Sequence, residues 1–271
     1  MQLLRRHFSG FYAVIISAFI LVTSCSDVNL YSPEQSVELG NRMSEQIAQD
    51  DRQFPELNNP RARQYLQNIC NRIVQAPQIK YKNLFKWKVT IIDNDKTVNA
   101  FAIPGGYIYF YTGMLKMLDA EATVAAIMAH EIAHAEERHA TEQMTKAYGQ
   151  QILLGIALGE DPGRLESMLA NLFNGLALLK HSRDDEMEAD EMSFKYLNSI
   201  NVWYPGAMKQ FFEKMEKGKS GPQVMEIFST HPQDENRVEK INEMLRDNNV
   251  GPPTDQNMKY REYAKFKQML R

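Results

Sequence analysis

The residues best suited to chemistry lie in one short segment, residues 129–134, with the sequence AHEIAH. On a helix, residues four positions apart lie one turn above each other, so the imidazoles of His130 and His134 can meet at one point. This H-E-x-x-H spacing suits Zn²⁺, which accepts neutral imidazole nitrogens and keeps one position open in catalytic sites. Glu131 is placed to take a proton from an attacking water and pass it to a leaving amine. The pattern indicates metal-assisted hydrolysis.

The context of the motif predicts a buried helix from about residue 120 to residue 140. Residues 122–129 are nearly all small or apolar, and polar groups in such a helix need a reason to be desolvated. A shared metal ion would supply that reason. The alternative is a surface helix that holds these residues by chance. That alternative fits residues 136–139 (EERH) better, so we expect His139 at the surface.

A third ligand is expected from residues 182–190 (SRDDEMEAD), which read as a helix start. Ser182 is a plausible cap, and acidic residues in the first turn favour the positive end of the helix dipole. Glu186 and Asp190 are four apart and share a face. One carboxylate would complete the metal set, and the other would accept a hydrogen bond from the free ring nitrogen of a ligating histidine. The other acidic residues are expected to be solvated: Asp184, Asp185 and Glu188.

The elements that position these residues are mostly helices. Ser32 and Pro33 predict a helix start, and a second helix is expected at about 60–74. Strands are predicted at 87–92 and 107–111, which are rich in β-branched and aromatic residues. No repeat and no Gly/Ser-rich or Pro-rich linker divides the body. The prediction is one α+β domain, mostly helical, with a small β-sheet beside the active-site helix.

Composition excludes several classes of protein. The chain has 271 residues, 44% of them apolar, and a net charge of −3, which is typical of a globular protein. No basic surface is indicated, so a nucleic-acid partner is not expected. The two cysteines, Cys25 and Cys70, cannot build a disulfide scaffold.

The N-terminus has the order of a secretory signal. Arg5 and Arg6 precede an apolar run at 11–22, which small residues and then Cys25 follow. The run is shorter than the roughly 20 residues that cross a bilayer as a helix. The segment resembles the lipobox of bacterial lipoproteins, which implies loss of residues 1–24, a lipidated Cys25 and a mature domain at 25–271. The alternatives are an uncleaved anchor or a plain secretory signal.

Several separated motifs together resemble the M48 family of zinc metallopeptidases, which includes the Oma1 enzymes and periplasmic quality-control proteases of bacteria. The resemblance spans most of the mature chain and rests on residues 99–106, 130–134, 182–190 and 230–232, and on Arg237. It implies a zincin-like fold of the compact lipoprotein type.

The resemblance also implies residue roles. His130, His134 and Glu186 would be the ligands of one Zn²⁺ ion per chain, and Glu131 would be the general base. Asp190 would hold a ligand histidine through a hydrogen bond.

The same resemblance places His231 and Arg237 near the metal. His231 lies at a loop–helix junction, where a side chain can project into a cleft. It would either stabilise a developing oxyanion, with Arg237, or occupy the open metal position as a brake. The alternative is a surface histidine and an arginine paired with Glu235 or Glu239. His181 is expected to be structural or exposed.

The segment at 99–111 has an expected role in substrate binding. An edge strand beside a metal site can bind an extended peptide as one more strand, through main-chain hydrogen bonds. In this strand, which includes Phe101, Asn99 would bond to the substrate main chain. Gly105 and Gly106 would let the backbones approach closely. The alternative is an ordinary hairpin turned by Pro-Gly-Gly.

The sequence thus predicts a zinc endopeptidase that acts on extended or misfolded polypeptides of the bacterial cell envelope. It would be anchored through Cys25, in the outer membrane facing the periplasm because Ser26 is not acidic. Two apolar stretches, 152–158 and 168–179, are expected to form a helical hairpin in the core, or else a lid. The rival functions are a metal-binding chaperone or assembly factor and a zinc hydrolase of a non-peptide substrate.

Overall fold

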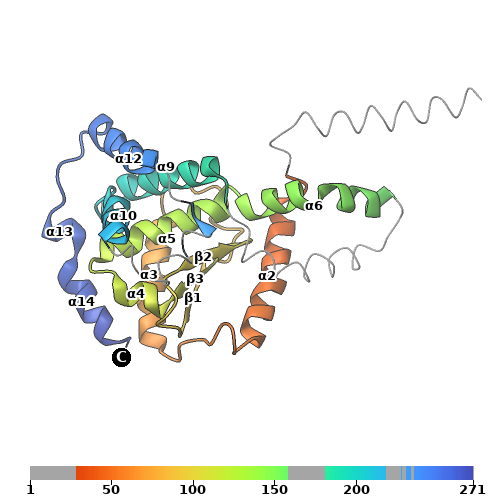
Figure 1. Ribbon diagram of the computed structural model, residues 1–271, viewed down its shortest axis with the longest axis horizontal. Helices are drawn as coiled ribbons and strands as arrows, with labels where there is room; N and C mark the ends of the chain where they lie inside the picture. The colour runs from red at the N-terminus through yellow and green to blue at the C-terminus, as the bar shows by residue number, and fades with distance from the viewer. Residues whose placement is uncertain (1–28, 158–180, 218–226, 228–229, 233–234, 271) are drawn as a thin grey trace, which may run out of the picture.

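The computed structural model describes residues 29–157, 181–217, 227, 230–232 and 235–270 (Figure 1). Its elements in chain order are α2 (Pro33–Gln49), α3 (Pro60–Ile73), β1 (Lys88–Ile92), β2 (Ala100–Ile103), β3 (Tyr107–Tyr111), α4 (Thr112–Met117), α5 (Glu121–Glu136), α6 (His139–Ala157), α9 (Arg183–Ile200), α10 (Ala207–Lys217), α12 (Glu235–Asp247), α13 (Asp255–Met258) and α14 (Tyr260–Gln268). The described chain is mostly helical with one small sheet, which confirms the predicted α+β class.

Local sequence signals set the helix starts. Ser32 caps α2 through a capping box with Gln35, and Pro33 occupies its first turn. The side chain of Asn59 caps α3, which begins at Pro60. Both predicted starts are confirmed, because the caps satisfy N–H groups that have no partner inside the helix.

The sheet has the strand order β1-β3-β2. β1 pairs with β3 in parallel, and β2 pairs with β3 antiparallel, with Ala100 opposite Phe110. β1 begins at Lys88, one residue later than predicted, because Trp87 has a φ of 45°, which does not continue a strand. β2 is an edge strand and falls within the segment expected to carry one.

The sheet separates two apolar clusters. Ile108 and Phe110 of β3 face the larger cluster, which includes residues of α3 and α5. Tyr107, Tyr109 and Tyr111 face the smaller cluster, which includes residues of α2. This alternation follows from the two-residue period of a strand. Figure 1 shows α5 between the sheet and α9.

The two glycines of the β2–β3 turn serve the fold. Gly105 and Gly106 have φ of 78° and 86°, in the left-handed region that favours glycine. A Cβ on Gly105 would lie 2.9 Å from the Cα of Val37, and one on Gly106 would lie 3.1 Å from the backbone nitrogen of Trp87. We expected these glycines to let a substrate backbone approach. The backbone that approaches them instead belongs to this chain.

Gly40 is where α2 meets this turn, and its replacement provides a test of the packing. A Cβ there would lie 1.8 Å from the carbonyl oxygen of Pro104. Gly40→Ala therefore forces the helix and the turn apart, and overpacking of this kind costs about 1–3 kcal/mol. We expect the melting temperature to fall by roughly 2–4 °C for each kcal/mol. Gly251→Ala is the control, since its added Cβ meets no atom within 4 Å in the described part of the chain, its own neighbours in sequence aside; equal melting temperatures would contradict the close contact.

Several expectations concern residues outside the described chain. The signal segment, Cys25 and the stretch 168–179 are among them, and of the stretch 152–158 only the helical backbone of α6 to Ala157 is described. Among the described helices, none combines the length and apolar character needed to cross a membrane.

Candidate metal centre

Helix α5 presents the two motif histidines to one point. Every residue of α5 is buried, and its alanine-rich sequence lets neighbouring elements pack closely around it. His130 and His134 are each 3% exposed, and their Nε2 atoms lie 3.0 Å apart. The helical spacing therefore produces the convergence that the sequence predicted.

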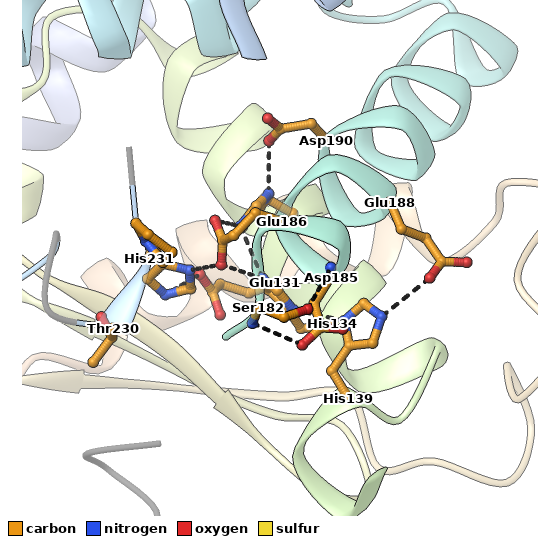
Figure 2. Close-up of polar contacts among 12 residues, drawn as sticks. Glu131, His134, His139, Ser182, Asp185, Glu186, Glu188, Asp190, Thr230 and His231 are labelled. Atoms are coloured by element: carbon orange, nitrogen blue, oxygen red, sulfur yellow. Dashed lines mark hydrogen bonds and ion pairs between the residues drawn. The ribbon is translucent and has the colours of Figure 1, made fainter. Parts of the chain in front are cut away.

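Glu186 reaches the same point from α9. Ser182 and Asp185 form a capping box at the start of α9, which fixes where its first turn begins. The Glu186 side chain is fully buried, with Oε2 3.5 Å from His130 Nε2 and Oε1 3.4 Å from His134 Nε2. Figure 2 shows the Glu186 carboxylate directed toward the histidines. Two segments some fifty residues apart thus meet at one site.

His231 adds a fourth donor. Its Nδ1 lies 2.9 Å from Glu186 Oε1, and its Nε2 lies 3.6 Å from Glu131 Oε1. The side chain is 7% exposed, so the alternative of a surface histidine is wrong. One ligand atom from each of His130, His134, Glu186 and His231 lies within 4.8 Å of the others.

The donor set fits a small divalent cation. Ligands at 2.0–2.1 Å from a tetrahedral Zn²⁺ lie about 3.4 Å from one another. The separations of 3.0, 3.4 and 3.5 Å among the two Nε2 atoms and the Glu186 oxygens are close to this value. Burial lowers the pKa of His130, but hydrogen bonds to Asp190 and Glu186 outweigh it and raise the pKa to about 9. Burial also opposes the charge of Glu186, but His231, His130 and His134 hold the pKa of this carboxylate well below its ordinary value, so it is an anionic donor.

Asp190 and Arg237 contact the candidate ligands on the side away from the point where these converge. Asp190 Oδ1 lies 2.9 Å from His130 Nδ1, which leaves the Nε2 lone pair available for a metal. Arg237 donates from Nε and Nη2 to both oxygens of Asp190, at 2.6 and 2.9 Å, and from Nη1 to Glu186 at 2.6 Å. It also lies over the ring of Phe212.

This arrangement changes the expected role of Arg237. The residue is 4% exposed, so the alternative of a surface ion pair is wrong. Its guanidinium binds the carboxylates of Asp190 and Glu186, so its N–H groups are not directed to a substrate oxyanion. Although burial alone would raise the pKa of Asp190, Arg237 and His130 lower it. Arg237 therefore keeps Asp190 ionised and orients Glu186.

Glu131 connects the site to the edge strand. Burial raises the pKa of its carboxylate, although His231 and His130 act in the opposite direction. The carboxylate accepts a hydrogen bond from the backbone N–H of Ala102 in β2. Because the Tyr111 N–H donates to the carbonyl of Asn99, antiparallel alternation turns the main-chain groups of Ala102 toward the outer edge. That edge therefore faces the candidate metal site.

Asn99 and Phe101 have partners within this chain. The Asn99 side chain is 6% exposed and accepts the N–H of Ala100 at 2.9 Å, which differs from the expected bond to a substrate. Phe101 stacks on Tyr109 with ring centroids 4.8 Å apart, in the apolar cluster that includes α2. Their contribution is to hold β2 in place.

The sequence reasoning missed three buried polar residues. His139 was expected at the surface but is 2% exposed, and Glu136 is 1% exposed and accepts the backbone N–H groups of Lys80 and Tyr81. Asp185 is 7% exposed because it belongs to the capping box. The continuous helix predicted to residue 140 is broken at Arg138, where φ is 61°. No local sequence signal predicts that reversal, since arginine rarely adopts this conformation.

Comparisons with known proteins agree with this geometry. The sequence pattern described as Peptidase family M48 matches residues 60–245. Mitochondrial metalloendopeptidase OMA1 of Schizosaccharomyces pombe is 34% identical over 185 residues, which are 67% of this chain and 52% of that protein. The beta-barrel assembly-enhancing protease of Escherichia coli K12 is 28% identical over 197 residues, 68% of this chain and 39% of that protein.

This chain matches a larger share of a third relative. Metalloprotease LoiP of Escherichia coli K12 is 31% identical over 153 residues, which are 55% of this chain and 60% of that protein. This chain spans about half of the OMA1 protein and less of the beta-barrel assembly-enhancing protease. The family pattern covers more than half of the chain and includes both α5 and α9. The chain therefore belongs to peptidase family M48.

Proposed function

We propose that this chain is a zinc-dependent endopeptidase that cleaves extended or misfolded proteins of the bacterial cell envelope. The observation that carries the proposal is the convergence of His130, His134 and Glu186 on one buried point, with the Glu131 carboxylate beside it. Family membership supports hydrolysis of peptide bonds over other zinc-dependent chemistry.

Each residue of the site has a proposed role in peptide hydrolysis. His130, His134 and Glu186 would hold a zinc ion, which when bound supplies a Lewis acid that polarises the scissile carbonyl. Glu131, with its pKa raised by burial, accepts a proton from the attacking water and delivers it to the leaving amine. His231 lies close enough to both Glu131 and Glu186 to stabilise developing negative charge or to fill the open position.

Substrate binding is assigned to the outer edge of β2. Ala100 and Ala102 turn their main-chain groups to this edge, so an extended polypeptide would pair there as an additional strand, in exchange for the N–H bonds that Asn99 and Glu131 accept. Pairing through the main chain does not read side chains, which suits substrates that share only an unfolded conformation. The Escherichia coli relative is named as a beta-barrel assembly-enhancing protease, and this similarity supports the proposed location in the cell envelope.

The proposed anchor is a lipidated Cys25, exposed after loss of residues 1–24, with residues 25–271 as one peptidase domain. The chain would lie at the outer membrane facing the periplasm. The supporting features are the basic, apolar and small-residue order before Cys25 and the non-acidic Ser26.

Metal removal tests the activity. We expect the soluble form that begins after Cys25 to contain one zinc ion per chain and to cleave unfolded casein. A chelator should abolish cleavage, and added Zn²⁺ should restore it, because the Lewis acid cannot be replaced by protein groups. Full cleavage by metal-free protein would contradict the proposal, and so would a zinc-loaded protein that never cleaves.

A further inference from the structure

His139 is buried beside the site and has a partner at each ring nitrogen. Its Nδ1 lies 2.8 Å from His134 Nδ1, and its Nε2 lies 3.3 Å from Glu188 Oε2. His139 is the first residue of α6, and the left-handed Arg138 brings it back against the last turn of α5. Figure 2 shows the side chains of His134, His139 and Glu188 in this order.

A single assignment of protons satisfies all of these contacts when a metal is bound. A histidine that coordinates through Nε2 carries its proton on Nδ1. The Nδ1–H of His134 then donates to Nδ1 of His139, and the proton of His139 lies on Nε2, where it donates to Glu188. Neither buried imidazole is left with an unpaired polar atom, so the cost of burying His139 is offset.

We infer that His139 is a positioning residue, which fixes the ring orientation and proton placement of His134 for metal binding, and that Glu188 orients His139. This inference rests on the proposed metal site. Asp190 Oδ1 lies 2.9 Å from the Nδ1 of His130, as an ion pair and not as an aligned hydrogen bond. The two motif histidines would therefore each be oriented through Nδ1, one by a carboxylate and the other by a neutral imidazole.

The neighbouring His181 suggests a competing interpretation. Donor atoms of His134, His139 and His181 also lie within 4.8 Å of one another, and His181 Nδ1 has no hydrogen-bond partner among the described residues. A second ion there would require His134 to lose its Nδ1 proton while Nε2 holds the first ion. The His134–His139 contact at hydrogen-bond distance favours the chain of hydrogen bonds from His134 through His139 to Glu188, which we call the relay. His181 stacks on His134 with ring centroids 3.9 Å apart.

Zinc affinity tests the inference without a readout of cleavage. In the soluble form, competition with a chromophoric chelator gives the zinc dissociation constant and the number of ions bound. Loss of a group that orients a metal ligand weakens binding about 10–100-fold. We expect this loss for His139→Leu, which removes the acceptor. His139→Asn places an oxygen near the position of Nδ1 and should stay within a few-fold of wild type.

The Glu188 side chain is 56% exposed, and Glu188→Gln keeps an oxygen that can accept the His139 N–H. We therefore expect a smaller effect on zinc affinity than for His139→Leu. Glu191→Gln is the matched control for Glu188→Gln on the same helix, because it neutralises a carboxylate whose ion-pair partner among the described residues is the exposed Lys195. It should leave the dissociation constant unchanged. An effect of Glu191→Gln as large as that of Glu188→Gln would overturn the role of Glu188.

A measurement on the wild-type protein does not depend on how the variants fold. In zinc-loaded protein with ¹⁵N-labelled histidine, a nitrogen–nitrogen coupling is expected across the bond from His134 Nδ1 to His139 Nδ1. Its absence overturns the relay, and so does unchanged zinc affinity in His139→Leu. Two bound ions, one of them lost in His139→Leu, would overturn it in favour of the second site. Wild-type protein that binds no zinc would instead overturn the proposed function together with this inference.

Discussion

Glu131→Gln is expected to lower the rate of casein cleavage by about 10²–10⁴-fold, the usual contribution of a general base. Glutamine has nearly the same shape and can still accept the Ala102 N–H, but it cannot take a proton from water. Zinc content and affinity for unfolded casein should therefore remain at wild-type values. Cleavage of a fluorogenic casein measures the first quantity, and metal analysis and fluorescence anisotropy measure the others.

The same variant separates the proposed enzyme from a binding factor. Glu45→Gln is the control, since Glu45 is an exposed carboxylate on α2. A chaperone that grips unfolded chains would suppress their aggregation equally well with either substitution. If Glu131→Gln cleaves as fast as Glu45→Gln, Glu131 is not the base. If wild-type protein binds but does not cut, the binding function is favoured.

Arg237→Met is expected to destabilise the metal-free protein by about 3–5 kcal/mol, because it leaves the carboxylates of Asp190 and Glu186 buried without their cation. Chemical denaturation in the presence of a chelator measures this loss. Arg246→Met is the matched control, since Arg246 is exposed on the same helix. Asp190→Asn added to Arg237→Met should recover part of the loss, because it removes one unpaired charge.

The loss should also depend on pH. In the wild type, Arg237 and His130 outweigh burial and lower the pKa of Asp190 below its ordinary 3.8. That contribution to stability is present above pH 3.8 and disappears as the pH falls through the lowered value. Without Arg237, only His130 opposes burial, so the pKa of Asp190 rises and the folded state keeps the proton to a higher pH. The deficit of Arg237→Met should therefore grow from pH 4 to pH 7; a deficit independent of pH would contradict this account.

Local sequence was enough for the elements and for part of the site. The helix starts at Ser32 and Ser182 follow from capping, which involves only the next few residues. The pairing of His130 with His134 follows from helical periodicity alone. Glu186 and Asp190 could be selected because their spacing puts both carboxylates on one face of α9. These predictions needed no knowledge of what packs against the helices.

The remaining features depend on contacts between segments that are far apart in the chain. The position of Arg237 between Glu186 and Asp190 depends on how α12 packs against α9. The burial of Glu136 depends on the backbone N–H groups of Lys80 and Tyr81, which its carboxylate accepts. The need for glycine at position 105 depends on the close approach of α2. His139 reaches His134 only because the chain reverses at Arg138. Sequence periodicity selected the candidate metal-binding side chains. The tertiary structure determined which groups contact them, because those partners come from elements whose relative positions no local pattern encodes.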